Sequence, residues 1–259
     1  MLRSLLTYAT LLAGAVQALP VAEEAAIAEM EVRSSSSIPT EENGACYVAA
    51  GSSCPSTAVL SNGDHDDGKS IGLVLHNPDT QDRMFFIYKN SCDCVPVKYL
   101  TIPAGSKKFV AFPADFQGRL QRGTAHNLDG KTHRLGTWME FSWDKNGWGW
   151  ADVSLIKGCD GAVSVKAIDG IGASQGFTNE VDVLVGAPTG AYKKKAGGGA
   201  KVIMETENVS DYKEIYTTPR NWLAGKLGWD KAYIDDYHGN PDICSTNGRF
   251  DITFYPGRS

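Results

Sequence analysis

The chain has 259 residues, with 25 Lys and Arg against 30 Asp and Glu, so its formal net charge is −5. Apolar residues make up 42% and charged residues 21%, which is typical of a globular protein and excludes a disordered or collagen-like chain. The acidic balance offers no positive field to attract phosphates, so we expect neither nucleic acid nor a membrane as a partner.

The first 18 residues have the pattern of a secretory signal peptide. Arg3 precedes an apolar run, and Val16 and Ala18 precede the expected cleavage point. The run is shorter than the about 20 apolar residues that a membrane span requires, and no later segment is apolar enough to span. We therefore expect residues 1–18 to be removed and the mature protein to be secreted and extracellular.

Secretion determines how the cysteines are interpreted, because an even number in an oxidising compartment favours disulfides, here up to three. The spacing leaves the pairing open, although Cys92 and Cys94, separated only by Asp93, are expected to pair outward rather than with each other. Cys-x-Cys is not the spacing of a zinc knuckle, so we expect no metal and no other cofactor. We expect all six cysteines to be paired in the mature protein, namely Cys46, Cys54, Cys92, Cys94, Cys159 and Cys244.

Residues 19–44 are rich in Ala, Glu and Ser and contain little that a core could bury. This composition indicates a flexible leader or pro-segment, with a possible short helix at 22–32, followed by one folded domain at 45–259. Within that domain, Asn208-Val-Ser210 is a glycosylation sequon, which in a secreted protein predicts a glycan on Asn208 in a surface loop.

From residue 71 onward, short apolar runs alternate with Gly, Pro, Asn and Asp about every ten residues, which predicts a β-sandwich or barrel. In the last run Phe250, Ile252 and Phe254 alternate with polar residues, as in a half-buried strand. One short helix is expected at 217–228. The expected strands are 71–76, 83–88, 99–102, 107–112, 137–143, 150–156, 163–165, 181–185, 200–204 and 249–254.

Three lysines at 193–195 precede a glycine run at 197–199. The alternatives are an anion-binding patch and the solvated tip of a hairpin. We favour the hairpin tip, because three adjacent lysines are not expected to be buried.

The most specific pattern lies in Gly136-Thr-Trp-Met-Glu-Phe-Ser-Trp143 and Gly149-Trp-Ala-Asp-Val-Ser-Leu-Ile-Lys-Gly158. These segments resemble the core signature of thaumatin-like proteins, and segments 229–236 and 247–256 resemble that family's C-terminal segments in the same order. The resemblance covers about residues 70–257 and implies an all-β, flattened β-sandwich with long loops and one short helix. Fewer cysteines than usual, and Tyr255 where the family has a closing cysteine, indicate a divergent, fungal-type secreted member.

Thaumatin-like proteins have an acidic cleft, lined by Arg, Glu and Asp residues, that is associated with β-1,3-glucan binding. The resemblance places Lys157 at one of the family's carboxylate positions. The family's Arg falls on Gly123, so Arg122, one residue earlier, is the candidate for that role. The carboxylates that match the lining are Glu140, Asp152 and either Asp235 or Asp236.

Glu140 and Asp152 are expected on neighbouring strands, where two carboxylates accept hydrogen bonds from sugar hydroxyls. At about 5–10 Å they also suit the acid and the nucleophile or base of glycoside hydrolysis. Lys157 argues against a general acid, because a nearby cation lowers a carboxyl pKa. The alternative is a structural role in which both carboxylates orient loops.

Trp148 lies in a glycine turn, where a tryptophan either stacks on a sugar ring or a protein partner, or staples the turn. The sequence thus predicts a monomeric extracellular protein that binds cell-wall β-glucan or a related polysaccharide. One alternative is a secreted effector or inhibitor that binds proteases or other hydrolases of another organism. The other is a weak endo-β-1,3-glucanase, whose candidate catalytic residues are Glu140 and Asp152.

Overall fold

The computed structural model describes residues 38–41, 46, 53–208 and 214–259. The signal peptide predicted at 1–18 and the short helix predicted at 22–32 lie outside this part of the chain. Within it, no helix combines the length and the apolar character that crossing a membrane demands.

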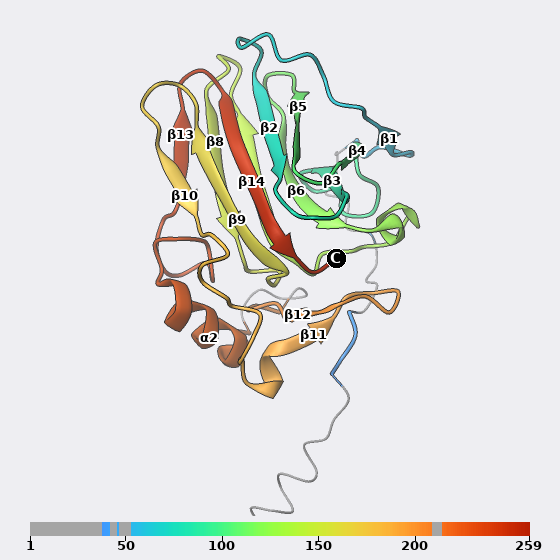
Figure 1. Cartoon of the computed structure of the whole chain (residues 1–259), viewed down its shortest axis with the longest axis vertical. Coiled ribbons are helices and arrows are strands. Elements are labelled where there is room, and N and C mark those ends of the chain that lie inside the picture. Colours follow the sequence, from blue (N-terminus) through green and yellow to red (C-terminus); the bar gives the residue numbers. More distant parts are fainter. Residues whose placement is uncertain (1–37, 42–45, 47–52, 209–213) are drawn as a thin grey trace, which may run out of the picture. The chain divides into compact units, whose positions relative to one another are not determined.

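Two β-sheets form the body of the protein (Figure 1). The larger has the strand order β1-β4-β3-β6-β7-β8-β13 and the smaller β10-β9-β14-β2-β5. Neighbouring strands are antiparallel except for β1 with β4 and β2 with β14. The strands are β1 (Val59–Leu60), β2 (Gly72–Asn77), β3 (Arg83–Lys89), β4 (Lys98–Ile102), β5 (Ser106–Ala111), β6 (Gln117–Gly123), β7 (Trp138–Trp143), β8 (Gly149–Ser154), β9 (Gly161–Ala167), β10 (Ser174–Gly176), β13 (Ile243–Ser245) and β14 (Arg249–Gly257).

Below the sheets in Figure 1 lie the hairpin of β11 (Tyr192–Lys194) and β12 (Lys201–Ile203) and the helix α2 (Thr217–Leu227). Two short 3-10 helices complete the described part of the fold: η1 (Ala125–Leu128) between β6 and β7, and η2 (Thr189–Ala191) directly before β11. Helix α2 ends at Gly228, whose φ of 73° is readily adopted by glycine. The predictions of an all-β protein and of a short helix at this position are therefore confirmed.

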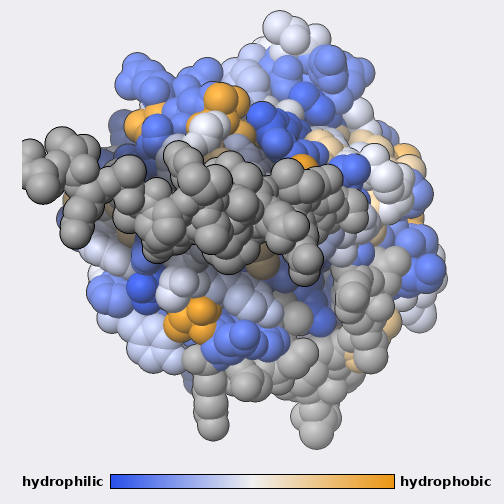
Figure 2. All heavy atoms as spheres, turned by 90° about the horizontal axis from the view of Figure 1, so that it is seen from below, coloured by the Kyte–Doolittle hydropathy of each residue, from blue (hydrophilic) through white to orange (hydrophobic). Residues whose placement is uncertain are grey.

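The core lies between the two sheets, where alternate side chains of facing strands meet. Phe85 of β3 and Phe254 of β14 join the sheets, with ring centroids 5.0 Å apart. Phe250, Ile252 and Phe254 are all buried, as their alternation predicts. On the outside, the face seen from below is mainly hydrophilic, and its apolar side chains form small separate patches (Figure 2).

The expected strand at 181–185 is wrong. The Asp182 side chain accepts hydrogen bonds from the backbone N–H groups of Leu184 and Val185, which folds the segment into a turn. In contrast, β6 was not expected, because its Gly and polar residues resemble a turn. The folded unit spans Ile38–Ser259.

The lysine run forms part of the β11–β12 hairpin, but its burial differs from expectation. Lys195 is 8% exposed, and its Nζ lies 2.6 Å from the fully buried Asp160 carboxylate. Lys193 pairs with Glu205. The run is therefore held by ion pairs and is only in part a solvated tip.

Two disulfides join Cys46 to Cys94 and Cys54 to Cys92. Cys92 and Cys94 therefore bond to other cysteines and not to each other, as predicted. The expectation that all six cysteines pair is wrong for Cys159 and Cys244. Cys159 is fully buried, and its sulfur accepts a hydrogen bond from Thr137 Oγ1 at 3.4 Å. Cys244 lies on β13, the edge strand of the larger sheet. Its cross-strand neighbour on β8 is Trp150, so strand pairing places no second cysteine opposite it.

Candidate functional site

Three charged residues stand in one row across the outer face of the larger sheet. Strand pairing places Arg119 of β6 opposite Glu140 of β7, and Glu140 opposite Asp152 of β8. Their neighbours Leu120 and Met139 are fully buried and point into the core, so the charged side chains project outward. Adjacent strands lie about 4.7–4.9 Å apart, which brings the three groups into one site.

The row is the centre of a polar grid on β6, β7 and β8. The row on one side contains Gln117, Ser142 and Trp150, and the row on the other side contains Gln121, Trp138 and Ser154. A cleft of about 300 Å³ opens over this grid. Its lining consists of Asn90, Gln117, Gly118, Arg119, Trp138, Glu140, Phe141, Ser142, Trp150, Asp152 and Asp242.

Arg119 is held firmly in the cleft wall. Its Nη1 donates to Asp93 Oδ1 at 2.7 Å, and its Nε donates to Gln121 Oε1 at 3.3 Å. The guanidinium also stacks over Trp138 and Tyr88, 4.1 and 4.4 Å from their ring centroids. The second terminal nitrogen, Nη2, is buried without a hydrogen-bond partner among the described residues. Arg119 is thus a fixed group whose Nη2 has no hydrogen-bond partner in the described part of the chain.

The two carboxyl groups of the row have raised pKa values. Burial and then the charges of Glu140 and Asp242 raise the pKa of Asp152 to about 9. Burial also raises the pKa of Glu140, which outweighs the opposing charges of Arg119 and Lys157. Asp152 Oδ1 is buried without a partner in the described part of the chain. At neutral pH the site therefore holds a protonated Asp152 beside Glu140.

Lys157 is expected from the sequence to disfavour a general acid by lowering a neighbouring carboxyl pKa, but the net shift of the Glu140 pKa is upward. The charge of Lys157 does lower the pKa of Glu140, but by less than burial raises it. Lys157 is itself buried, and burial lowers its pKa. The negative charges of Glu207 and Asp236 act in the opposite direction and raise the pKa of Lys157.

Of the two exposed tryptophans in this hairpin, Trp150 lies in the cleft. It is 38% exposed and contributes to the lining. Trp148 is 46% exposed but is absent from the lining. It lies in a turn that Asp144 closes by accepting hydrogen bonds from the backbone of Asn146 and Trp148.

Arg122 is not in the row of the cleft. It lies three residues after Arg119 on β6, so its side chain is on the opposite face of the strand. It is 2% exposed, and its guanidinium packs against Gly161 and Gly257 at the ends of β9 and β14. Arg119 takes the position that the sequence assigned to Arg122.

The two C-terminal aspartates have different roles. Asp235 is fully buried and accepts hydrogen bonds from the backbone of Tyr237 and His238, so it shapes its own loop. Asp236 is exposed, and its charge raises the pKa of Glu140. Neither lines the cleft of the central row, where Asp242 supplies the additional carboxylate.

Asn208 lies near the surface, and its side-chain amide donates to Glu214 Oε2 at 2.7 Å. Ser210 of the sequon lies outside the described residues. Glycosylation of Asn208 therefore stays a prediction.

The sequence matches no protein-family model and no curated protein. What defines the molecule is its architecture: two packed β-sheets with a polar cleft on the outer face of the larger one.

Proposed function

We propose that the protein is a secreted thaumatin-like protein that binds a neutral cell-wall polysaccharide, β-1,3-glucan or a related glycan, in the cleft over β6, β7 and β8. One observation carries the proposal. Arg119 and Asp152 both line this cleft, and Arg119 Nη2 and Asp152 Oδ1 are buried and unpartnered among the described residues. Buried polar atoms without partners are costly, so both favour a ligand that supplies hydrogen bonds.

A sugar satisfies both atoms, because each hydroxyl group donates one hydrogen bond and accepts others. Trp150 adds a half-buried ring at the edge of the same cleft, which suits the apolar face of a pyranose. The charge of Arg119 is already matched by Asp93, and Asp152 is protonated at neutral pH. The cleft therefore favours a neutral ligand over an ionic one.

The resemblance to thaumatin-like proteins agrees with this proposal. The family's Glu and first Asp correspond to Glu140 and Asp152, which are direct cross-strand neighbours here. The signal-peptide pattern and the two disulfides suit a secreted, extracellular protein.

Titration of the purified protein with laminarin, a soluble β-1,3-glucan, tests the proposal. Glu140→Gln keeps the shape of the side chain but removes its charge, so we expect affinity to fall about tenfold with little change in Tm. Glu180→Gln, at an exposed turn residue outside the cleft, is the control. No binding by the wild type overturns the proposal and leaves the effector or inhibitor alternative. Unchanged affinity of Glu140→Gln, with no hydrolysis by the wild type, overturns the assignment of glucan binding to this cleft.

Weak glucan hydrolysis is a second candidate, and the carboxyl pair favours it. Retaining glycosidases place two carboxyl groups about 5–5.5 Å apart, one protonated as the acid and the other acting as nucleophile. Asp152, with its pKa near 9, fits the acid, and Glu140 beside it fits the nucleophile. Release of reducing sugar from laminarin that Glu140→Gln abolishes, with affinity nearly unchanged, would favour this candidate over binding alone.

A further inference from the structure

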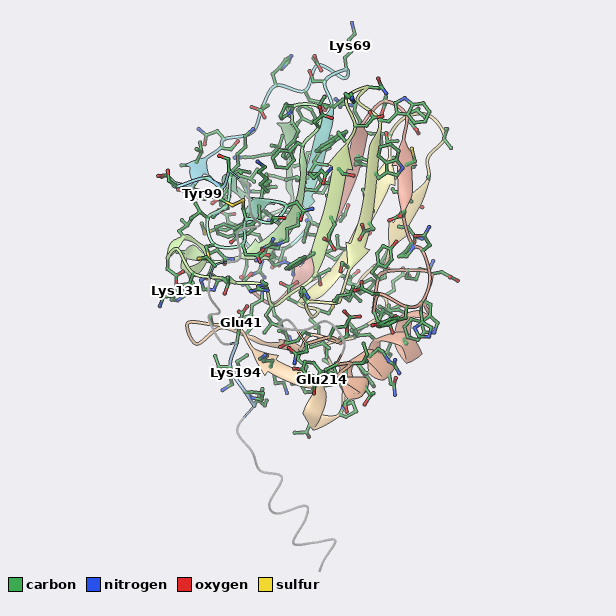
Figure 3. All side chains as sticks on the ribbon, turned by 180° about the vertical axis from the view of Figure 1, so that it is seen from behind. Glu41, Lys69, Tyr99, Lys131, Lys194 and Glu214 are labelled. Atoms are coloured by element: carbon green, nitrogen blue, oxygen red, sulfur yellow. A yellow bond between two sulfur atoms is a disulfide. The ribbon has the colours of Figure 1, made fainter. Side chains whose placement is uncertain are left out.

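Residues 38–41, which composition assigns to the leader, form part of the folded unit. They run parallel to β11, with Thr40 opposite Lys194. The Glu41 N–H donates to the Lys194 carbonyl, and the Lys194 N–H donates to the Pro39 carbonyl, both at 2.7 Å. Glu41 and Lys194 accordingly lie close together in Figure 3.

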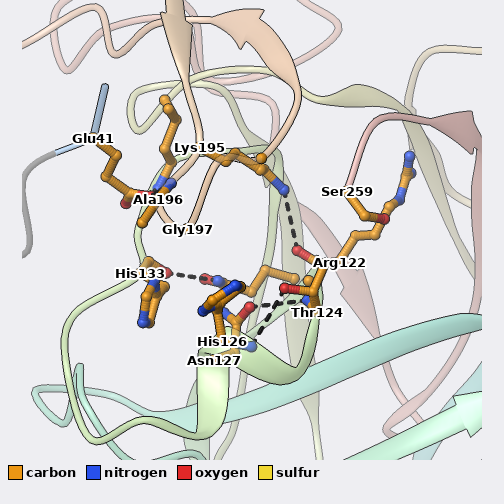
Figure 4. Close-up of a pocket in the computed structure, with 14 residues that line it drawn as sticks. Glu41, Arg122, Thr124, His126, Asn127, His133, Lys195, Ala196, Gly197 and Ser259 are labelled. Atoms are coloured by element: carbon orange, nitrogen blue, oxygen red, sulfur yellow. Dashed lines mark hydrogen bonds between the residues drawn. The ribbon is translucent and has the colours of Figure 1, made fainter. Parts of the chain in front are cut away.

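The Glu41 side chain binds backbone that is distant in the sequence. Its Oε1 accepts hydrogen bonds from the N–H groups of Arg134 and Leu135 at 2.7 and 2.8 Å. Its Oε2 accepts one from the Ala196 N–H at 3.3 Å. The carboxylate thus forms one wall of a second cavity of about 190 Å³, where it faces the Lys195–Ala196 segment (Figure 4). Glu41 thereby fixes the backbone at 134–135.

Two series of polar contacts, called routes below, connect the 133–135 backbone to Arg119 in the cleft. The His133 carbonyl accepts a hydrogen bond from Gln121 Nε2 at 2.7 Å, and Gln121 Oε1 accepts one from Arg119 Nε at 3.3 Å. In parallel, Arg134 Nε lies 3.6 Å from Asp93 Oδ2, and Asp93 Oδ1 accepts from Arg119 Nη1 at 2.7 Å. The first route begins at the His133 carbonyl, which shares a peptide unit with the Arg134 N–H that Glu41 binds, and the second begins at Arg134 itself. Both end at one guanidinium group.

The N-terminal part of the chain also constrains Asp93, the hydrogen-bond partner of Arg119, through two disulfides. The polar contacts of the two routes are called the Arg119 network below. Asp93 lies between Cys92 and Cys94, and each of these forms a disulfide with an N-terminal cysteine. Asp93 is therefore fixed from both sides. The other end of the network is the 133–135 backbone, which Glu41 anchors.

We infer that Glu41 is a positioning residue for the cleft, acting through the 133–135 backbone to hold Arg119 in its ligand-binding orientation. The inference rests on the proposed function insofar as it concerns saccharide affinity. The orientation of Arg119 itself is a property of the protein without ligand. The segment at 38–41 is thus part of the binding machinery, and a mature chain that lacks it has a weaker cleft.

The ligand-free test uses the Nε–H signal of Arg119 in ¹⁵N NMR spectra of the full chain, assigned by its loss in Arg119→Lys. We expect Glu41→Ala to shift or broaden this signal, and Glu41→Gln to restore it, because Gln keeps a carbonyl oxygen for the 134–135 amides. Glu180→Ala is the control and leaves the signal unchanged. Should Glu41→Ala not fold, Glu41→Asp, which withdraws the carboxylate by one methylene group, takes its place. An unchanged Arg119 signal overturns the inference.

Laminarin titration supplies the second readout. We expect Glu41→Ala to weaken binding about fivefold, the size of coupling expected within one hydrogen-bond network, but to have no further effect once Arg119 is Lys. Additive losses in the double variant overturn the inference, because Glu41 then acts on the fold and not through Arg119. If the wild type binds no laminarin, the proposed function fails, and the NMR comparison alone decides the inference.

Discussion

Glu140 and Asp152 occupy directly opposite positions on β7 and β8, and Arg119 extends the same row onto β6. Two carboxyl groups at this separation do not both ionise readily when they are half-buried, because each charge disfavours the other. Burial raises the pKa of both groups, and the charge of Glu140 adds to the effect of burial on Asp152, whose pKa is about 9. The row therefore contains a carboxyl group that stays protonated at neutral pH and a guanidinium that stays charged.

The first prediction concerns stability against pH. Asp152 in the unfolded chain titrates near 3.8, whereas in the folded protein it titrates near 9. Between these values the folded state binds the extra proton, so the free energy of unfolding falls as pH rises from about 4 to about 9. The Asn side chain of Asp152→Asn stays neutral over this pH range. At pH 7 the free energy of unfolding of Asp152→Asn should therefore exceed that of the wild type by at least about 1 kcal/mol.

Urea denaturation at pH 5, 7 and 9 measures this difference. The wild type should lose stability along the series relative to Asp152→Asn, and the gap should widen with pH. A constant gap would show that Asp152 titrates normally.

The second prediction separates the two exposed tryptophans. Trp150 lines the cleft and Trp148 does not, although both are partly exposed in the same hairpin. We expect Trp150→Ala to lower laminarin affinity roughly tenfold through loss of ring stacking, with a small change in Tm. Trp148→Ala is the matched control, and its affinity should equal that of the wild type. Equal losses in both variants would place the ligand over the turn instead.

The strands and the helix were largely predictable, because apolar runs and turn residues are local signals. The cleft was predictable in part: Glu140 and Asp152 line it as the sequence predicts, but its arginine is Arg119 and not Arg122. This difference depends on which face of β6 each side chain occupies, and β6 itself, with two glycines and polar alternate residues, resembles a turn. Which side chains of β6 point to the outer face becomes known only once the register of β6 against β7 is known.

Other features depend on partners far along the chain. Trp138, Trp150 and Asp242 join the cleft through strand register and a distant loop. Glu41 acquires its role from backbone N–H groups more than 90 residues away. No local pattern marks such contacts, since each side chain alone resembles an ordinary surface or core residue.

The third prediction concerns the thiols. The Cys244 side chain is partly exposed, whereas Cys159 is fully buried and its burial raises its pKa to about 12. Without reductant, the native protein should therefore be alkylated at Cys244 alone, and slowly, because burial also raises the pKa of Cys244. Denaturant should expose Cys159 as a second site. Intact mass and peptide mapping check this order, and a protein with no reactive thiol in denaturant would contradict the two-disulfide pattern.

The fourth prediction concerns the buried ion pair beneath the β11–β12 hairpin. Lys195 Nζ lies 2.6 Å from Asp160 Oδ2, and both residues are almost inaccessible to water. Removing one partner leaves the other charge buried and unmatched, so Asp160→Asn should lower the free energy of unfolding by about 3–5 kcal/mol in urea at pH 7. The control is Asp64→Asn, whose carboxylate lies 3.9 Å from Lys98 in a partly exposed pair, and it should cost about 1 kcal/mol or less.

A second substitution tests the reason for that loss. Lys195→Met placed on Asp160→Asn removes the unmatched charge and keeps most of the side-chain volume. If the uncompensated ammonium group is what destabilises the single variant, the double variant should regain much of the lost stability, because apolar replacements of buried ion pairs are often neutral. If the double variant is less stable than Asp160→Asn, then the contribution of Lys195 lies in its hydrogen bonds to Asp160 and the Arg122 carbonyl rather than in its charge.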